Sequence, residues 1–563
     1  MSNYLTNNEA SARATGSRSR RKLWLASGVA GLTGVVSLAA VGIAGSAGAV
    51  GVSGLKWNTT QQVTKDGDQG RGDEGRDDEG PDRGGKDDRD GKDHERGKEV
   101  PCDTDRLIQA IVFANSRDGG VLELAKGCTY NLTRNQDGNG LPVITQNVTL
   151  RGEHTTITRD ATADYFRILN VGPGGHLSLK GLTIKGGQTI EAFTAVAPAA
   201  VWGAYSDSQA IAAQVKAGTP LAQALAARQA NPKAGLKAAP KAAVKAAVKA
   251  AVKAAPKAKA KPGTATTLVE EPGDNDGAGI LVQPGGTANL FDTSVVLNQS
   301  GGNGGGLANF GTTSLRHTEV AHNTAFFFGG GIFNAGLLQV DESTITDNTA
   351  VIGGGGISNG AAEIFTEDVD GGTVLIEKSK ITDNETLGFG GGLLDIGGNT
   401  TVRYTELLSN TAVLAGGGIA AADAQVNVHD STVAKNSTAG VGGGVAVAFD
   451  SAVTIEKSHL KENTAGFFGG GLFNADSVTT VRESEVVANR ALGPIGVGGG
   501  IFNIFGEVNL SRTKVANNFA TFAPGGVFTF FGAVNVDDKS AIVANRPTNC
   551  LAIPGDTIPN CFG

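Results

Sequence analysis

The sequence predicts an all-β protein, a right-handed parallel β-helix with a short N-terminal capping helix and a low-complexity insertion. Two observations predict this fold class. A phrase of Ser or Thr, any residue, an aliphatic residue, two residues and Asn occurs ten times, with steps of 25, 25, 36, 26, 26, 27, 26, 29 and 27 residues, and a glycine cluster follows most copies. Such a period is typical of a solenoid, in which one repeat is one coil. The ten asparagines are Asn298, Asn323, Asn348, Asn384, Asn410, Asn436, Asn463, Asn489, Asn518 and Asn545.

Each position of the phrase has a structural interpretation. From Val295 to Ile542 an aliphatic residue stands three positions before each Asn, and in nine copies another stands eight positions before it. We expect these side chains to point inward and to stack on those of the next coil. The Ser or Thr five positions before the Asn fits a hydrogen-bonded turn or stack. Stacked asparagines are expected to hydrogen-bond along the axis through their amides.

The glycine clusters decide between two kinds of solenoid. The spacing of the aliphatic residues and the Asn also matches a leucine-rich repeat, which needs a helix or a similar segment after the Asn. Here clusters such as Gly329-Gly330-Gly331 are followed by Ile332-Phe333-Asn334, which is poor helix and good strand sequence. Glycine also permits a sharp turn and close backbone approach. We therefore predict a β-helix with about three short strands per coil and a rise of ~4.8 Å per coil.

The N-terminal segments are expected to export the chain. Residues 1–49 resemble an export signal, with basic Arg20-Arg21-Lys22, an apolar stretch and small residues up to Ala49, after which we expect cleavage. The basic residues also fit a twin-arginine signal, and an uncleaved membrane anchor is the alternative. Residues 50–100 are rich in Asp, Glu, Lys, Arg and Gly, a composition that cannot bury a core and predicts a disordered tether.

Four cysteines stand near the two ends of the predicted body. An even number in an exported chain indicates two local disulfides, Cys102 with Cys128 and Cys550 with Cys561, rather than a metal site. Leu107, Ala110, Ile111 and Ala114 share one face of a predicted helix behind Asp103 or Thr104 as N-cap. We expect this helix to cover the first coil within an N-terminal unit of residues 101–187. Residues 277–563 should form the main β-helix and its C-terminal cap.

Residues 188–276 interrupt the repeat. Leu179, Leu182 and Ile184 occupy the aliphatic and hydroxyl positions of one copy, so Gly187 stands where the Asn is expected, and the glycine cluster of that coil comes only at 277–279. The insertion is rich in Ala, Lys and Pro. Two interpretations are open: a soluble spacer, or a polycationic arm that binds an anionic polymer. The arm would use lysines at every fourth position, among them Lys241, Lys245, Lys249 and Lys253.

Catalytic residues are not expected from the repeat itself. An enzymatic alternative rests on His322, Asp347 and Asp383, which precede the Asn in three successive copies. Two carboxylates one coil apart would raise the pKa of one of them. Seven positions before the Asn, charges of opposite sign alternate. They predict pairs between Arg316 and Asp341, Glu377 and Arg403, and Glu456 and Arg482 on a solvated face.

The loops after the Asn contain many apolar residues and are candidates for binding. Either they line one exposed edge of the solenoid, or they fold back and cover one another. A second stripe, including Phe333 and Phe502, follows the glycine clusters. The candidate binding residues in the loops are Phe326, Phe327, Phe328, Phe389, Phe467, Phe468 and Phe522.

The pairing of Ile345-Thr346-Asp347-Asn348-Thr349-Ala350 with Gly354-Gly355-Gly356-Ile357 resembles the repeats of the polymorphic outer-membrane proteins. It is also similar to exported bacterial β-helix repeat proteins with a pectate-lyase-like solenoid. The resemblance implies a secreted or cell-surface, adhesin-like module. We expect its partner to be a cell-wall or extracellular polysaccharide or another anionic polymer, with no specific nucleic acid, no membrane after signal cleavage, no cofactor and no metal. The alternative function is a polysaccharide lyase or glycoside hydrolase on the same fold.

Overall fold

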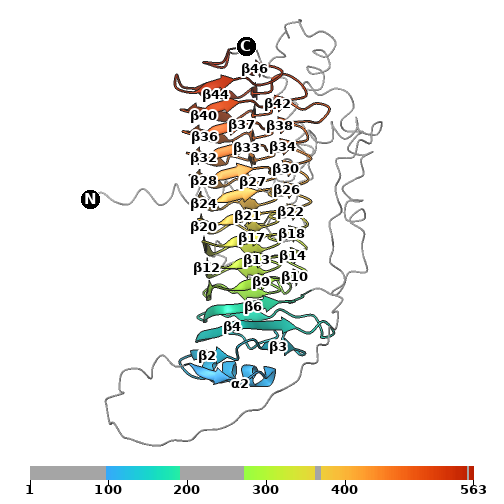
Figure 1. The fold of residues 1–563 in the computed structure, drawn as a ribbon, viewed down its shortest axis with the longest axis vertical. Coiled ribbons are helices and arrows are strands. Elements are labelled where there is room, and N and C mark those ends of the chain that lie inside the picture. The colour runs from blue at the N-terminus through green and yellow to red at the C-terminus, as the bar shows by residue number, and fades with distance from the viewer. Residues whose placement is uncertain (1–96, 190–271, 362–368, 554–556, 563) are drawn as a thin grey trace, which may run out of the picture.

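The protein is a parallel β-helix. The computed structural model describes residues 97–189, 272–361, 369–553 and 557–562. Strands of successive coils pair in parallel and stack into three sheets of 25, 12 and 9 strands, which run along a rod from the N-terminal coils to the C-terminal ones (Figure 1). The predicted fold class is confirmed.

One regular coil contains four strands, where the sequence predicts about three. In the coil that contains Asn348, β15 (Ile332–Asn334) belongs to the 12-stranded sheet, β16 (Leu337–Asp341) and β17 (Thr344–Thr346) belong to the 25-stranded sheet, and β18 (Thr349–Ala350) belongs to the 9-stranded sheet. The extra division arises because Glu342 and Asp347 have φ of 46° and 53°, which bends the chain on both sides of β17.

The remaining strands repeat this plan. The 12-stranded sheet also contains β5 Leu169–Val171, β7 Ile280–Val282, β11 Leu307–Asn309, β19 Ile357–Asn359, β23 Leu393–Ile396, β27 Ile419–Ala422, β31 Val445–Ala448, β35 Leu472–Ala475, β39 Ile501–Ile504, β43 Val527–Phe530 and β46 Cys550–Ile553. The 9-stranded sheet also contains β10 Gln299–Ser300, β14 Thr324–Ala325, β22 Glu385–Thr386, β26 Thr411–Ala412, β30 Ser437–Thr438, β34 Thr464–Ala465, β38 Arg490–Ala491 and β42 Phe519–Ala520.

The 25-stranded sheet begins with longer strands and then continues as pairs of short ones. Its other members are β1 Lys98–Val100, β2 Gly120–Leu124, β3 Thr129–Leu132, β4 Asn147–Arg159, β6 His176–Lys185, β8 Thr287–Phe291, β9 Ser294–Val296, β12 Thr312–Arg316, β13 Glu319–Ala321, β20 Thr373–Glu377, β21 Lys380–Thr382, β24 Asn399–Arg403, β25 Glu406–Leu408, β28 Gln425–His429, β29 Thr432–Ala434, β32 Ala452–Glu456, β33 His459–Lys461, β36 Val478–Arg482, β37 Glu485–Val487, β40 Glu507–Ser511, β41 Lys514–Ala516, β44 Ala533–Val536 and β45 Ala541–Val543.

The predicted inward positions form the main core. Val320, Ile345 and Ile381 stand three positions before their asparagines, pair with one another in register, and are fully buried. Leu315, eight positions before Asn323, is also fully buried. This stack continues along the rod and removes apolar surface from water in every coil, which stabilises the fold.

The asparagines form the predicted ladder through the interior. Nδ2 of Asn348 donates to Oδ1 of Asn384 in the next coil at 3.0 Å and to the backbone O of Val320 in the previous coil at 2.8 Å. Oδ1 of Asn384 also accepts from the backbone N of Asn348 at 3.1 Å. Each buried amide therefore joins three coils and leaves none of its polar atoms unpaired.

The hydroxyl row makes a second ladder. The backbone N of Ser343 donates to Oγ of Ser379 at 3.1 Å, and Oγ of Ser343 donates back to the O of Asp341 at 2.7 Å. The prediction of a hydrogen-bonded turn and stack is confirmed.

The glycine clusters are required by close packing against the ladder. Gly329 has φ of 68°, where a side chain is strained. A Cβ at Gly331 would lie 2.7 Å from the O of Gly356 and 3.0 Å from Cγ of Asn348. This contact explains why the Asn and the glycine cluster occur together in the sequence.

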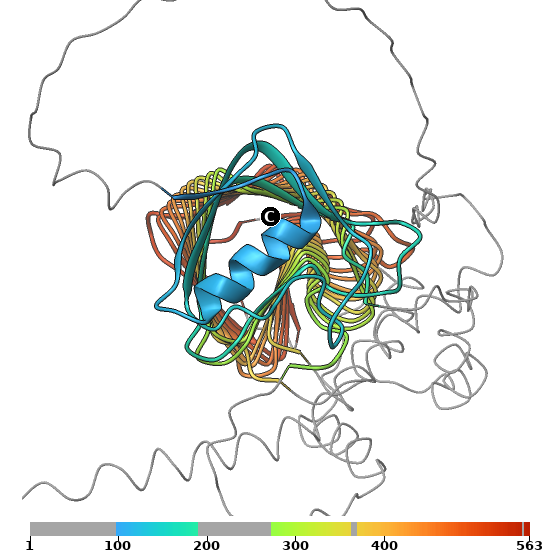
Figure 2. The ribbon, with the colours of Figure 1, turned by 90° about the horizontal axis from the view of Figure 1, so that it is seen from below.

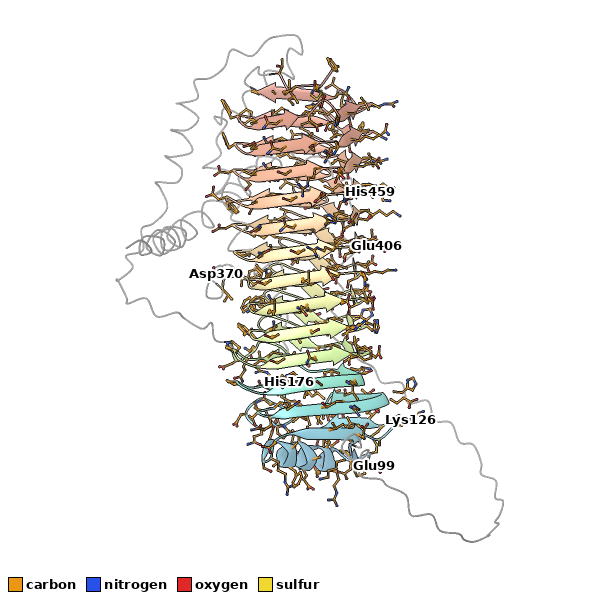
Figure 3. The ribbon with its side chains drawn as sticks, turned by 90° about the vertical axis from the view of Figure 1, so that its left-hand side faces the viewer. Glu99, Lys126, His176, Asp370, Glu406 and His459 are labelled. Atoms are coloured by element: carbon orange, nitrogen blue, oxygen red, sulfur yellow. A yellow bond between two sulfur atoms is a disulfide. The ribbon has the colours of Figure 1, made fainter. Side chains whose placement is uncertain are left out.

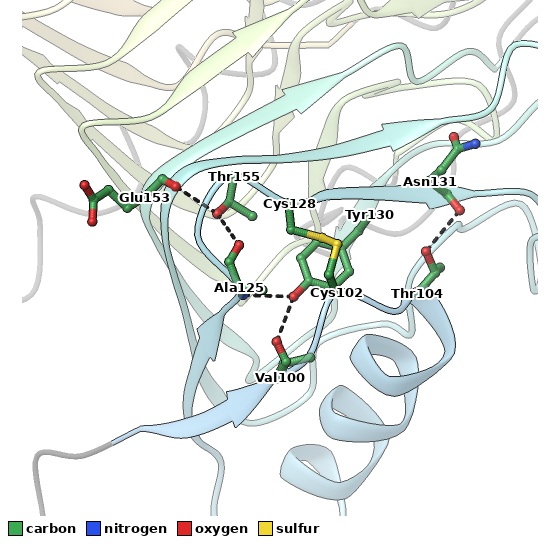
Figure 4. Close-up of a disulfide and its surroundings, with 9 residues drawn as sticks. All are labelled: Val100, Cys102, Thr104, Ala125, Cys128, Tyr130, Asn131, Glu153 and Thr155. Carbon is green, nitrogen blue, oxygen red and sulfur yellow. Dashed lines mark hydrogen bonds between the residues drawn. A yellow bond between two sulfur atoms is a disulfide. The ribbon is translucent and has the colours of Figure 1, made fainter. Parts of the chain in front are cut away.

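A helix closes the N-terminal end of the rod. α2 (Thr104–Asn115) lies across this end of the rod, and Asp103, one of the two residues predicted as the N-cap, occupies that position (Figure 2). Leu107, Ala110, Ile111 and Ala114 are buried, as predicted. Cys102 and Cys128 form a disulfide beside it, and the Tyr130 hydroxyl donates to the O of Val100 at 2.9 Å (Figure 4). Cys550 and Cys561 form the second predicted disulfide, at the C-terminal end.

The insertion begins and ends at neighbouring points on the β-helix. β6 pairs with β9 so that Ile184 is opposite Val295, which confirms that the coil before the insertion is in frame with the coil after it. Gln188, Thr189 and residues 272–276, at the ends of the predicted insertion, are described and contact the body; the predicted signal, the tether and the four candidate lysines lie outside the described residues. No helix in the described part of the chain is long and apolar enough to cross a membrane.

Candidate functional site

The alternative catalytic residues lie together on an exposed turn. His322, Asp347 and Asp383 follow β13, β17 and β21 on three successive coils, all three are exposed, and their φ values are 55°, 53° and 56°. The same left-handed geometry recurs at Leu297 and Lys435, so the turn does not depend on residue type. Partial burial, and then repulsion from Asp347, raise the pKa of Asp383. The arrangement therefore provides two interacting carboxylates on an outer edge of the rod.

The predicted charge ladder is present. Arg316 lies 3.7 Å from Asp341, Arg403 lies 3.6 Å from Glu377, and Arg482 lies 2.6 Å from Glu456. On the neighbouring strand row, which includes the labelled Glu406 and His459, Lys380 lies 3.9 Å from Glu406 and His459 lies 3.4 Å from Glu485 (Figure 3). Pairs this exposed each contribute about 0–1 kcal/mol. These outer surfaces of the 25-stranded sheet neutralise much of their own charge.

The phenylalanine loops fold back over the outer face of the 12-stranded sheet. Phe328, Phe467 and Phe468 are 1%, 6% and 1% exposed, so these candidate binding residues belong to the interior and do not face a ligand in solution. The loops bury them because they pack on the outward residues of the sheet strands. The other four candidates, which are half-buried and packed against the same clusters, are Phe326, Phe327, Phe389 and Phe522.

The outward residues of the sheet complete this second core. Phe473 and Phe502 stack at 5.6 Å between ring centroids, and Phe502 and Phe528 lie 5.0 Å apart. Phe333 occupies the equivalent position nearer the N-terminus and is fully buried. The expected second stripe is therefore a buried aromatic row, and apolar side chains fill the groove between the sheet and its loops over these coils.

At the N-terminal coils, other residue types occupy the outward positions of the 12-stranded sheet that line this groove. Asn170 and Leu281 occupy the outward positions that Ala308 and Phe333 occupy further along the sheet. A cavity of about 670 Å³ opens here, beside the point where the insertion re-enters the body. We call it the N-terminal pocket and define it by Asp137, Asn139, Arg167, Asn170, Asp274 and Gln283.

A tight turn places one wall of the N-terminal pocket. Asp137 and Gly138 have φ of 50° and 73°, and the backbone N of Gly138 donates to Oδ1 of Asn135 at 3.1 Å. The O of Gly138 accepts from the backbone N of Arg167 at 3.0 Å, which holds the turn beside the Arg167 backbone.

A row of amides crosses the pocket. Nδ2 of Asn170 donates to Oδ1 of Asn139 at 3.1 Å, and Nε2 of Gln283 donates to Oδ1 of Asn170 at 3.0 Å. In the described part of the chain, Oε1 of Gln283 accepts no hydrogen bond. The row therefore offers a half-buried acceptor to a donor in the pocket.

Arg167 is the charged group of the pocket. It is 8% exposed, and its Nη2 donates to the backbone O of Asp274. Its Nε has no hydrogen-bond partner among the residues that the structure describes. Burial lowers the pKa of Arg167, and the nearby charges of Asp276 and Asp274 oppose that shift. Burial also raises the pKa of Asp276, whose oxygens accept from the backbone N of Asn303 at 2.7 Å and of Gly273 at 3.0 Å.

Sequence reasoning missed the N-terminal pocket. Arg167, Asn139 and Asn170 lie outside the ten regular repeats, so no fixed offset marks them. Two signals could have indicated the site: a polar Asn at a position that is apolar in most later coils, and the nearby insertion. Within the described residues, no group of three or more His, Cys, Asp or Glu is arranged to hold a metal ion.

The fold and the two disulfides define a parallel β-helix protein suited to an oxidising compartment. No protein-family model matches the sequence, and no curated protein matches it. Among solved structures, the chain is similar to the A-module of the mannuronan C-5 epimerase AlgE6 of Azotobacter vinelandii. The identity is 12%, the TM-score is 0.29, and the alignment covers 80% of this chain and 96% of that module. A likeness at this level assigns neither an activity nor a substrate.

Proposed function

We propose that the protein is a secreted or cell-surface β-helix module that binds a polysaccharide or another cell-envelope polymer without cleaving it. The disulfides, which form and persist in oxidising environments, support an extracellular site of action. The repeated coils supply a rod whose interior polar groups are bonded to one another, so the ladder residues are not free to bind a ligand.

The N-terminal pocket carries the proposal. It is an opening in a groove that apolar side chains fill elsewhere, and amides rather than phenylalanines line it. Concave sites with a few placed polar groups are the usual form of small-ligand sites, and the cavity volume falls within their range. Amide side chains can both donate to and accept from sugar hydroxyls. The pocket therefore fits a terminal or projecting sugar of a polymer.

The exposed carboxylates give weaker support to the enzymatic alternative. Asp347 and Asp383 lie on an outer turn whose geometry is the same with Leu297 or Lys435. A general acid in glycoside hydrolysis needs an environment that keeps it protonated near neutral pH. Asp383 is exposed, although partial burial raises its pKa, and it lacks such an enclosure.

Affinity electrophoresis tests the proposed function. The full chain is run through gels that contain neutral or acidic polysaccharides, beside Gln283→Ala, which removes the pocket acceptor, and Gln339→Ala, a matched change on an exposed part of β16. We expect at least one polymer to retard the parent and Gln339→Ala, and to retard Gln283→Ala less. No retardation by any polymer, or equal retardation of all three proteins, contradicts binding in the pocket.

The same polymers provide a test for cleavage. After incubation with the parent protein, we expect no loss of viscosity and no new reducing or unsaturated ends. Cleavage that Asp347→Ala and Asp383→Ala abolish would instead establish the enzymatic alternative.

A further inference from the structure

The buried cation in the N-terminal pocket has a chemical consequence for its ligand. Arg167 is nine-tenths buried, yet within the described residues no carboxylate lies within ion-pair distance of its guanidinium. Its side chain donates to a neutral backbone carbonyl, and in the described part of the chain its Nε has no partner. Buried charges in proteins are normally paired and hydrogen-bonded, because an unpaired one loses its hydration without compensation.

The surrounding acids do not complete the pair. Asp276 is close enough to act on Arg167 electrostatically, but its oxygens accept from backbone N–H groups of Asn303 and Gly273. The carboxylates of Asp137 and Asp274 belong to exposed residues at the rim. Water and salt screen such charges, whereas the field of a buried guanidinium is screened much less. The buried charge of Asp276 also opposes an anionic ligand, but it lies beyond ion-pair distance of the guanidinium, whereas a ligand in the pocket can contact the guanidinium directly.

The polar groups around Arg167 indicate what else the ligand carries. Oε1 of Gln283 and the rim carboxylates of Asp137 and Asp274 are acceptors, so they need donors on the ligand. Chloride or sulfate offers no donors to them. A sugar acid offers both features: one carboxylate for the guanidinium, which binds carboxylates in a forked geometry, and several hydroxyl donors for the acceptors.

We propose that the N-terminal pocket binds the carboxylate of an acidic sugar residue, with Arg167 as its cationic partner and Gln283 as an acceptor for a sugar hydroxyl. This inference rests on the proposed function, because it names the ligand class of the same site. It adds a requirement for negative charge, which polymer binding alone does not have.

Matched glycosides test the charge requirement by isothermal titration of the full chain. Methyl glucuronide and methyl galacturonide are compared with methyl glucoside and methyl galactoside, which differ from them by the carboxylate. We expect at least one uronide to bind about tenfold more tightly than its neutral counterpart, a typical effect of a charge-assisted contact. Equal binding of acidic and neutral glycosides, or binding of neither uronide, overturns the inference. The proposed function then still stands if a polymer retards the parent chain more than it retards Gln283→Ala.

Two charge variants locate the effect. Arg167→Gln should lower uronide affinity about tenfold or more, since it removes the charged partner, while Arg151→Gln, at an exposed ion pair on β4, should not change it. Because Arg167→Gln is a buried change, Asp274→Asn provides a second test: it keeps the backbone O that accepts from Arg167 and removes a negative rim charge. The loss of this rim charge should raise the ratio of uronide affinity to neutral-glycoside affinity about twofold at low salt, because any lost hydroxyl contact affects both ligands alike. An unchanged or lower ratio in Asp274→Asn contradicts the proposal.

Discussion

The backbone N of Gly187 donates to Oδ1 of Asn298 at 2.9 Å, although 111 residues separate them. One coil further on, the backbone N of Asn298 makes the same bond to Oδ1 of Asn323 at 3.0 Å, over 25 residues. The insertion therefore does not shift the register of the ladder. Its two flanks also meet, because Oγ1 of Thr189 donates to the O of Asn275 at 2.6 Å.

This register predicts that the insertion is dispensable for folding. Replacing residues 190–271 with about six Gly and Ser residues should leave the thermal midpoint unchanged or raise it. A shorter loop loses less entropy on closure, an effect of roughly 2 kcal/mol at most over this change in length. Circular dichroism melting of the two chains measures it. A fall of the midpoint together with loss of β signal would show that the insertion supports the rod.

An alanine at Asn410 should destabilise the rod strongly. Asn410 is fully buried, and its Oδ1 accepts from both N and Nδ2 of Asn384, at 3.1 and 3.0 Å. Truncation leaves the backbone N–H of Asn384 and one of its two Nδ2 hydrogens unpaired, since the other still donates to the O of Ile345, at a cost of about 1–3 kcal/mol for each unpaired group. Thermal melting should show a much lower midpoint for Asn410→Ala than for Asn399→Ala, which changes an exposed residue on β24. Equal midpoints would mean that the ladder contributes little to stability.

Asp395 ends a second polar row and predicts a pH dependence. Nδ2 of Asn309 donates to Asn334, Nδ2 of Asn334 donates to Asn359, and Nδ2 of Asn359 donates to Oδ1 of Asp395 at 3.2 Å. Asp395 is fully buried, and burial raises its pKa from 3.8 to about 7. The folded state therefore holds the proton more tightly than the unfolded state.

Stability should accordingly fall as the pH rises. The stabilising contribution of the Asp395 proton is complete below the unfolded pKa near 4. It declines as the pH rises to about 7, and above that pH it is lost and the free energy of unfolding changes no further through this group. Asp395→Asn keeps the shape without the charge, so it should raise the free energy of unfolding at pH 8 by up to about 4 kcal/mol and by little at pH 4. Melting curves across this range, with the exposed Asp538→Asn as control, measure the difference. An Asp395→Asn midpoint that tracks the parent at every pH contradicts the assignment.

The turn at Asp347 predicts opposite effects of glycine at adjacent positions. Asp347 has φ of 53°, which costs a non-glycine residue about 1 kcal/mol or more, so Asp347→Gly should raise the thermal midpoint or leave it unchanged. Thr346→Gly, in the adjoining strand β17, should lower it by the equivalent of about 1 kcal/mol. A larger loss from Asp347→Gly than from Thr346→Gly would indicate that the Asp347 side chain supports the structure.

The regular part of the fold could be predicted because one contact recurs in every coil. Asn410 and Leu407 occupy fixed offsets. Because each coil makes the same stacking contact there, the same residue types recur at these offsets. The frame even identified Gly187 as the position opposite Asn298. The left-handed turn at Asp347 could not be predicted in this way, since the residues at that offset range from Leu297 to Lys435 and share no chemical type.

The candidate site could be predicted only in part. The burial of Phe328 depends on how a variable loop folds back over the sheet, which the local sequence does not determine. The N-terminal pocket joins residues on both sides of the insertion, with Arg167 and Asp274 in contact across 107 positions. No periodicity connects them, so only the folded chain brings them together.

Hydrogen–deuterium exchange of the full chain with the polymer that retards it most tests the central claim, that the binding site is the N-terminal pocket. We expect slower exchange in peptides that cover residues 135–141, 166–171 and 281–284, and unchanged exchange around His322, Asp347 and Asp383. Protection confined to that turn row or to the outer face of the 25-stranded sheet, with none at the pocket, would contradict the claim.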